Sequence, residues 1–241
     1  MGLTTPKELF KISDTTRLID FSISHIRAAL GRVDVKVVVV IRPHKKEVAE
    51  HVRLQLPGVE VEAVMFDDSL REWPGSVYSA RGLFSGANLV LLPDSLLNVG
   101  RGRLADMPIC EDGSGFTLVD LMAAALERHE VVFGCVECSE PGILKNLGAL
   151  RIEDGLVTAF QDKPKDSFEL YNGYWGCFAF REGAAESLYG FLDSSVFHRP
   201  VSFREQSFYP AGAVILDSYR DFGNWEAVEQ YRRQVGGVPS Q

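Results

Sequence analysis

Apolar residues along this chain occur in two patterns, one with the spacing of a helix and one as short runs typical of strands. In the first part of the chain the two patterns follow one another in strict alternation, beginning with a helix. This order is typical of a doubly wound α/β sheet, in which helices cover mostly parallel strands. Helices are predicted over 16–30, 43–56 and 75–82, and strands over 35–41, 59–65 and 88–92.

The remainder of the chain predicts a more mixed arrangement. Glu153-Asp154-Gly155 separates two apolar runs, and an Asp-Gly pair at such a place is a strong signal for a β-hairpin. Asn224 is a typical cap for a final helix. The segment 97–115 is predicted to be a surface loop, and 193–208 shows no clear pattern. Helices are predicted over 117–128, 181–191 and 225–233, and strands over 131–138, 148–152, 156–162, 171–180 and 213–216.

The strand predicted over 88–92 organises the functional interpretation. Its apolar run ends at Pro93 and is followed by a single acid, Asp94. Such a run is typical of a strand buried on both faces of a largely parallel sheet. Ligands of open α/β sheets lie in the crevice beyond the carboxyl ends of these strands. We therefore expect Asp94 at a ligand-binding edge and favour metal-dependent phosphate chemistry there.

Composition excludes several classes of function. The 241 residues, 46% of them hydrophobic, suffice for one large or two small domains with a full core. No run of about 18 uncharged apolar residues occurs, so no membrane span is predicted. The first residues lack the apolar core of a secretion signal, and the net charge of −8 argues against non-specific nucleic-acid binding. We expect a cytoplasmic protein without nucleic-acid or membrane partners.

The four cysteines do not predict a metal or redox centre. Cys135 and Cys138 form a C-x-x-C pattern, but both lie in the strand predicted over 131–138. Residues three apart on a strand point to opposite faces, so the two thiols are not expected to share a ligand. Cys110 and Cys177 form no second C-x-x-C, and the histidines show no metal-ligand spacing. Reduced, structural thiols are therefore predicted.

Five short stretches follow one another along the chain: PKELFKI (6–12) with RLID (17–20), EWPGS (72–76), LLPD (91–94), FQDKP (160–164) and YRDFG (219–223). Together they resemble the sugar-1-phosphate nucleotidyltransferases, which make nucleotide sugars. The resemblance covers nearly the whole of 1–241. It implies a single α/β domain of the nucleotide-diphospho-sugar transferase type, with a mixed, mostly parallel sheet flanked by helices and a small β extension over about 148–180.

The resemblance implies an enzyme that joins a nucleoside triphosphate to a sugar 1-phosphate and releases pyrophosphate. Because the attacking sugar phosphate oxygen is already an anion, catalysis consists mainly of positioning and charge neutralisation at the α-phosphorus. Mg²⁺ is the expected cofactor, since it is held by one or two carboxylates together with phosphate oxygens and water. A glycosyltransferase on a similar sheet is disfavoured, because no Asp-x-Asp follows the strand over 88–92.

Two acids match the carboxylates that hold the metal in this family. Asp94 corresponds to the first and Asp221 to the second, and the resemblance places both at the crevice although they are far apart in the sequence. Each acid also has a simpler interpretation. Asp94 could be a loop acid that caps a helix, and 221–224 could be a turn before the last helix.

Two lysines match cations that neutralise phosphate charge in the family. Lys7 corresponds to a lysine that reaches the triphosphate, and Lys163 to one near the sugar phosphate. Asp162 corresponds to the acid that accepts hydrogen bonds from sugar hydroxyls. The alternatives are a solvated terminal lysine for Lys7, and solvated charges at a strand end for Asp162 and Lys163.

The other expected substrate contacts come from small or aromatic residues. The stretch around Gly75 matches a loop that approaches the nucleobase, where a missing side chain lets the backbone touch a flat ring. A Gly-Ser helix start is the alternative. Gly148 matches a glycine beside the sugar. Trp175 and Gly176 match the far wall of the sugar pocket, although Trp175 could instead belong to the core. The residues concerned are Trp73, Pro74, Gly75, Ser76, Gly148, Trp175 and Gly176.

The family's first strand and its phosphate-binding loop, L-A-x-G-x-G-x-R, have no match in this sequence. Residues 1–5 resemble only the end of that loop. The difference implies weak catalysis and two inner sheet edges without a partner, which favours aggregation. Three explanations are open: an N-terminally incomplete chain, a strand supplied by another chain as in a homo-oligomer, or a catalytically silent homologue that binds nucleotide or sugar phosphate for regulation. We favour the first.

Overall fold

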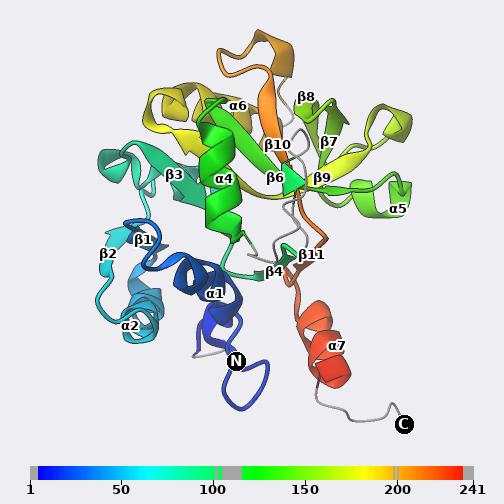
Figure 1. Ribbon diagram of the computed structural model, residues 1–241. Coiled ribbons are helices and arrows are strands. Elements are labelled where there is room, and N and C mark those ends of the chain that lie inside the picture. The colour runs from blue at the N-terminus through cyan, green and yellow to red at the C-terminus, as the bar shows by residue number, and fades with distance from the viewer. Residues whose placement is uncertain (1–4, 101–102, 105–115, 198, 200, 236–241) are drawn as a thin grey trace.

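The computed structural model describes residues 5–100, 103–104, 116–197, 199 and 201–235 (Figure 1). The helices are α1 (Asp20–Ala29), α2 (Lys46–Gln55), α3 (Glu72–Tyr78), α4 (Leu118–Leu126), α5 (Pro141–Leu144), α6 (Ala185–Val196) and α7 (Trp225–Val235). The strands are β1 (Lys36–Ile41), β2 (Glu60–Met65), β3 (Ala87–Val90), β4 (Ser95–Asn98), β5 (Arg103–Leu104), β6 (Val131–Glu137), β7 (Gly148–Glu153), β8 (Leu156–Asp162), β9 (Gly173–Arg181), β10 (Ala211–Ile215) and β11 (Ser218–Asp221). Within these residues, every helix is too short or too polar to cross a membrane.

A seven-stranded sheet forms the centre of the fold. Its order is β3-β9-β6-β10-β8-β7, with β5 beside β10 and β7 also pairing with β9. Strands β6 and β10 run parallel, whereas the other described pairs in this sheet are antiparallel. The mixed α/β class is confirmed, but the predicted predominance of parallel pairs is wrong. The reason is that the β7–β8 hairpin and β9 join the sheet as antiparallel neighbours.

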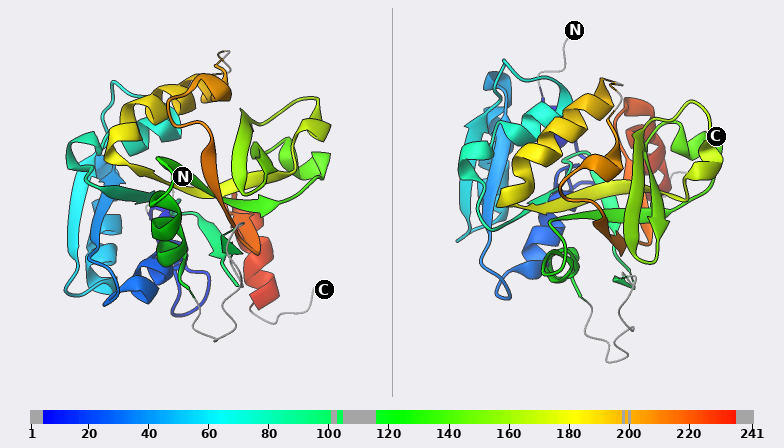
Figure 2. Two further views of the ribbon diagram at one scale, coloured as in Figure 1. Left: turned by 45° about the horizontal axis from the view of Figure 1, so that its top comes forward. Right: turned by 90° about the horizontal axis from the view of Figure 1, so that it is seen from above.

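Strand β9 separates two hydrophobic cores. Its residues are buried along almost the whole strand, because successive side chains point to opposite faces and both faces are covered. Phe178 and Phe180 enter the core beneath α6, whereas Cys177 and Ala179 enter the core beneath α4. The two helices therefore cover opposite faces of the sheet (Figure 2).

Strands β1 and β2 form a separate parallel pair that packs against α1 and α2. The valines at 37–40 are only half-buried, and so is most of β3. Within the described part of the chain β1 pairs only with β2, and β3 only with β9, so each keeps one edge without a strand. The prediction that 88–92 would be buried on both faces holds in part, because its apolar residues pack alternately against the cores beneath α6 and α4 but are only half-buried. The two open edges agree with the expectation drawn from the unmatched first strand.

Strands β4 and β11 form a short antiparallel pair next to the central sheet (Figure 1). The surface loop predicted over 97–115 is thus wrong at 97–98, which belong to β4, and at 103–104, which form β5. The rest of that segment, with Cys110, lies outside the described residues. The pairing matters because β4 directly follows Asp94 and β11 ends at Asp221.

The hairpin between β7 and β8 is confirmed. Asp154 and Gly155 adopt φ angles of 50° and 78°, as a two-residue type I′ turn requires. At the open end of the hairpin the ladder sets Gly148 opposite Asp162. Two residues that the sequence assigns to the sugar side are therefore neighbours.

Two of the cysteines are fully buried structural residues. Burial raises the pKa of the Cys135 thiol well above its usual value and that of Cys177 to about 12. Cys138 is half-buried just after β6. Among the described residues no cluster of three or more His, Cys, Asp or Glu side chains has the geometry of a metal site.

Helix α4 begins with a capping box whose contribution can be measured. The Thr117 hydroxyl accepts a hydrogen bond from the Asp120 amide at 3.2 Å, and the Asp120 carboxylate accepts one from the Thr117 amide at 2.8 Å. Thr117→Ala should lower the free energy of unfolding by about 1 kcal/mol, because a helix-terminal amide loses its acceptor. Urea denaturation tests this, with Ser139→Ala at an exposed site as the control. Equal losses in both variants would contradict the capping contribution.

Candidate active site

Asp94 and Asp221 are brought together by the β4–β11 pair. The ladder sets Ser95 opposite Asp221, and the Phe222 amide donates a hydrogen bond to the Asp94 carbonyl at 2.9 Å. Asp94 precedes a strand, so the helix-cap alternative is wrong. At Asp221 the turn alternative describes the backbone correctly, because the carboxylate accepts a hydrogen bond from the Gly223 amide at 2.8 Å. The two acids are therefore neighbours across a ladder that joins distant parts of the sequence.

Lys7 faces this pair of acids. Its Nζ lies 2.9 Å from Asp94 Oδ2, and both side chains are largely shielded from solvent. A short turn holds the lysine in place: the Leu9 amide donates to the Pro6 carbonyl at 3.0 Å, and the Leu9 side chain is buried. Lys7 is thus not a freely solvated terminal lysine.

The charges at this site act on one another. Burial, followed by the negative charge of Asp94, raises the pKa of Asp221. The Gly223 hydrogen bond and the positive charges of Lys7 and Lys163 act in the opposite direction. Burial also raises the pKa of Tyr219, to which Asp221 and Asp94 add their negative charges. Two acids and two lysines predicted from four separate stretches therefore share one electrostatic environment.

Lys163 reaches the site from the end of β8. It adopts a left-handed backbone conformation with φ of 47°, and its amide donates to the Leu147 carbonyl at 3.0 Å. A positive φ is uncommon for a residue other than glycine, and it turns the chain sharply out of the strand. Asp162, one residue earlier, stays in the ladder opposite Gly148. Lys163 is therefore held by a specific turn rather than by an ordinary strand end.

Gly148 and Trp175 form a close contact. A Cβ atom on Gly148 would lie 1.9 Å from Trp175 Nε1, so a glycine is required where the backbone meets the indole. Trp175 is 8% exposed, and among the described residues its buried Nε1 has no hydrogen-bond partner. The core alternative for Trp175 is correct, since it packs in the cluster beneath α6. Gly176 plays a similar part, because a Cβ there would lie 2.7 Å from the Tyr219 ring.

The stretch predicted to approach a nucleobase lies in α3. Pro74 and Gly75 are buried, and Gly75 makes room for Leu70, whose Cβ would lie 2.8 Å from an added Cβ. The helix-start alternative thus describes the backbone, while base contact by Ser76 stays a prediction. Trp73 packs on Trp175 with ring centroids 5.0 Å apart. This contact ties α3 to the strand that bears the predicted sugar wall.

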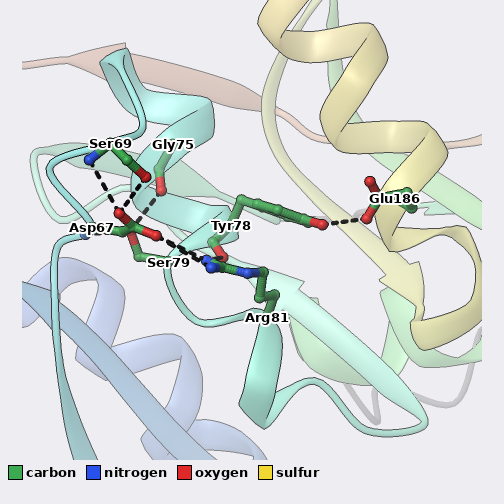
Figure 3. A network of polar contacts seen from close by, with 7 residues as sticks. All are labelled: Asp67, Ser69, Gly75, Tyr78, Ser79, Arg81 and Glu186. Atoms are coloured by element: carbon green, nitrogen blue, oxygen red, sulfur yellow. Dashed lines mark hydrogen bonds and ion pairs between the residues drawn. The ribbon is translucent and has the colours of Figure 1, made fainter.

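A polar network that the sequence did not predict fixes α3 (Figure 3). The Ser79 hydroxyl donates to the Gly75 carbonyl at 2.8 Å and accepts from the Asp67 amide at 2.9 Å. Arg81 in turn donates to the Asp67 carboxylate at 3.2 Å. On the other side of α3 the Tyr78 hydroxyl donates to Glu186 of α6. These contacts hold the C-terminal half of α3 from two sides, and no short sequence motif encodes the distant partners Asp67 and Glu186.

The residues present fit a divalent cation. Burial, followed by the negative charge of Asp94, raises the pKa of Asp221, and a cation between the two carboxylates would relieve the repulsion between them. Mg²⁺ commonly takes only one or two protein carboxylates and completes its shell with phosphate oxygens and water. Two carboxylates are therefore enough for Mg²⁺ when phosphate oxygens and water supply the other ligands.

Comparisons with known proteins agree with this geometry at the level of the fold. No protein-family model matches the chain, and no curated protein matches it. Solved structures do. The fold is that of the sugar-phosphate nucleotidyltransferases. At 9–14% sequence identity, these similarities show the fold of this chain but not its activity.

Three structures with this nucleotidyltransferase fold span nearly the whole chain. A candidate glucose-1-phosphate thymidylyltransferase from Bacillus anthracis has a TM-score of 0.69 at 9% identity, covering 99% of this chain and 89% of its own. UDP-glucose pyrophosphorylase from Acinetobacter baumannii has a TM-score of 0.68 at 13% identity, covering 97% and 86%. Inositol-1-phosphate CTP transferase from T. maritima has a TM-score of 0.59 at 14% identity, covering 98% and 90%.

The contact between Gly148 and Trp175 predicts a steric effect. Gly148→Ala should lower the free energy of unfolding by about 1–3 kcal/mol, because the new methyl group overlaps a buried ring. Adding Trp175→Phe, which removes the overlapping edge, should recover part of the loss. Urea denaturation measures both. Gly142→Ala, where an added Cβ meets nothing within 4 Å, is the matched control. An unchanged stability in Gly148→Ala would refute the close approach.

The raised pKa of Asp221 predicts a pH-dependent effect on stability. A carboxyl group whose pKa is raised by folding opposes folding once it is ionised. Asp221→Asn should therefore stabilise the protein at pH 7, by on the order of 0.5 kcal/mol after allowance for solvent screening. The gain should vanish as the pH falls through the raised pKa and the wild-type carboxyl becomes protonated.

Urea denaturation at pH 7 and in the acid range tests this effect. Asp34→Asn, which removes the same charge from an exposed loop before β1, separates it from the general gain of reducing a net charge of −8. A loss of stability at pH 7 in Asp221→Asn, or an equal gain in both variants, would show that Asp221 is not held in a repulsive environment.

Proposed function

We propose that this chain is a nucleotidyltransferase that joins a nucleoside triphosphate to a sugar 1-phosphate, forming a nucleoside diphosphate sugar and pyrophosphate. The observation that supports this most is the convergence of Asp94, Asp221, Lys7 and Lys163 on one electrostatic environment. Each was expected there from a different stretch of sequence. The fold shared with nucleotidyltransferases adds support of a coarser kind.

In the proposed reaction a sugar phosphate oxygen forms a bond to the α-phosphorus while the bond to the β-phosphate bridging oxygen breaks. No proton has to move, because nucleophile and leaving group are both anions, so the protein mainly supplies positive charge and alignment. Asp94 and Asp221 would hold Mg²⁺, which neutralises charge on the α-phosphate when bound. Lys7 would exchange its partner Asp94 for a phosphate oxygen of the triphosphate, and Lys163 would meet the sugar phosphate.

The sugar would lie against Gly148, with Asp162 accepting hydrogen bonds from its hydroxyl groups. Gly148 is opposite Asp162 in the hairpin, and Lys163 follows at once, so phosphate and sugar contacts come from one end of β8. The Trp73–Trp175 contact connects this end to α3, where Ser76 is proposed to face the nucleobase. Nucleotide and sugar phosphate would thus bind on two sides of the acids.

An alternative is a catalytically silent homologue that binds the same ligands for regulation. In that case Lys7 and the acids would bind a nucleotide without turnover.

Pyrophosphate release with Mg²⁺ across nucleoside triphosphates and sugar 1-phosphates tests the proposal. Asp94→Asn and Asp221→Asn should each lower kcat about 100-fold or more, because charge stabilisation in the transition state is lost. Asp34→Asn should keep the wild-type rate. Wild-type rates in both site variants would refute the assignment. Nucleotide binding by calorimetry without pyrophosphate release in any pair would support the silent alternative.

A further inference from the structure

A cavity lies apart from the acids, between the N-terminal segment and the start of α7. Its volume is about 400 Å³, and it is lined by Thr5, Leu9, Phe10, Lys11, Arg17 and Trp225. In Figure 1 the blue N-terminal loop and the red helix α7 lie at the same end of the molecule. Neither Lys7 nor Asp94 lines it. The cavity is therefore not part of the site described above.

The lining of this cavity is positively charged. Lys11 and Arg17 form an isolated antiparallel bridge, so they lie directly opposite each other, and the described lining contains no acid. The turn between them is closed by the Ile12 amide, which donates to the Thr16 carbonyl at 2.8 Å. Like charges directly opposite across a pair of strands are destabilising. An anion between the two side chains would remove that cost.

Arg17 is oriented without being neutralised. Its Nη1 lies 3.3 Å from His51 Nδ1, and His51 Nε2 lies 2.7 Å from Asp20 Oδ1. With Nδ1 accepting from the guanidinium, the ring proton lies on Nε2 and is donated to Asp20. The Asp20 carboxylate accepts a hydrogen bond from the Arg17 amide at 2.7 Å, but within the described residues no carboxylate lies within ion-pair distance of the Arg17 guanidinium. The guanidinium is thus fixed by a buried ring and keeps donors for a second acceptor.

The opposite wall of the cavity is aromatic. Phe10 and Trp225 meet edge to face with ring centroids 4.8 Å apart, and Trp225 is 39% exposed, unusually high for so large an apolar side chain. The Arg232 guanidinium lies over the Phe10 ring at 5.3 Å. A planar apolar group could therefore pack against Trp225 in the same cavity that Lys11 and Arg17 line.

We propose that this cavity binds a small phosphorylated ligand with a planar or apolar portion. The phosphate lies between Lys11 and Arg17, where a guanidinium fork and an ammonium meet it from two sides. The apolar portion packs on Trp225. Binding at this place does not depend on the function proposed for the acids, and it can be tested when that function fails.

Isothermal titration with phenyl phosphate, with inorganic phosphate as a second probe, tests the proposal on the full chain. Phenyl phosphate should bind several-fold more tightly than inorganic phosphate, because the ring gains an aromatic contact. Arg17→Ala should weaken phenyl phosphate binding about tenfold or more, and Lys11→Ala by a smaller factor. Trp225→Ala should remove the preference for phenyl phosphate while inorganic phosphate binding persists.

Matched variants separate this cavity from other cationic places. Lys145→Ala removes an exposed lysine at the end of α5 and should leave the affinity unchanged. Lys163→Ala removes a cation of the candidate active site and tests whether the probe binds there instead of in the cavity. If Arg17→Ala disturbs folding, as shown by circular dichroism, Arg17→Lys and Lys11→Ala serve instead, since both keep the His51–Asp20 contact. Unchanged affinity in the cavity variants, or a loss confined to Lys163→Ala, would overturn the proposal.

Discussion

The candidate active site depends on one four-residue ladder between β4 and β11. Its register sets Ser95 opposite Asp221, and the hydrogen bond from Phe222 to the Asp94 carbonyl fixes the next step of the chain. Without this pairing the two acids would sit at the ends of unrelated segments. With it they come close enough for burial and then the charge of Asp94 to raise the pKa of Asp221. Formation of the ladder thus stores a repulsion that a bound cation can relieve.

The ladder is itself held by the central sheet. The Leu216 amide donates to the Cys135 carbonyl at 2.7 Å, and the Asp217 amide to the Asn98 carbonyl at 3.0 Å, so the chain passes from β10 into β11 without a free loop. Tyr219 then packs over Gly176 of β9, where only a glycine leaves room for its ring. The ladder therefore rests on β9, which is buried on both faces.

Much of the fold follows from local patterns in the sequence. The early alternation of helix and strand, the Asp154-Gly155 turn and the helix cap at Asn224 depend on neighbouring residues, and the structure confirms them. The β4–β11 ladder could not be predicted in this way. Strands of four residues are too short to show a periodic pattern, and β4 and β11 lie more than a hundred residues apart in the sequence. Asp94 was indicated by its position after an apolar strand, whereas Asp221 and its pairing with Asp94 were reached only through the family resemblance.

Other differences between prediction and structure also arise from contacts between residues that are distant in the sequence. The apolar run over 88–92 predicted burial on both faces, but how deeply a strand is buried depends on its neighbours, and β3 has a described partner on one side only. Gly148 was expected beside a sugar, whereas in the structure its missing side chain makes room for the indole of Trp175. The network around Asp67 and the chain from Arg17 through His51 to Asp20 join distant residues, so no spacing in the sequence indicates them.

Charge placement distinguishes scaffold from sites in this chain. Across the β1–β2 pair Lys36 contacts Glu60 and Glu62 at 2.8 and 2.7 Å, so the register matches opposite charges. Two other pairings do the reverse: β4–β11 brings Asp94 beside Asp221, and the 11–17 bridge sets Lys11 against Arg17. A chain that already pairs opposite charges where only stability is at stake has no structural need for like-charged neighbours. Lys7 offsets only part of the repulsion at the acids, because burial and the charge of Asp94 still raise the pKa of Asp221. An ion of opposite sign would relieve each pair, and this is the physical reason for assigning a cation to the acids and an anion to the bases.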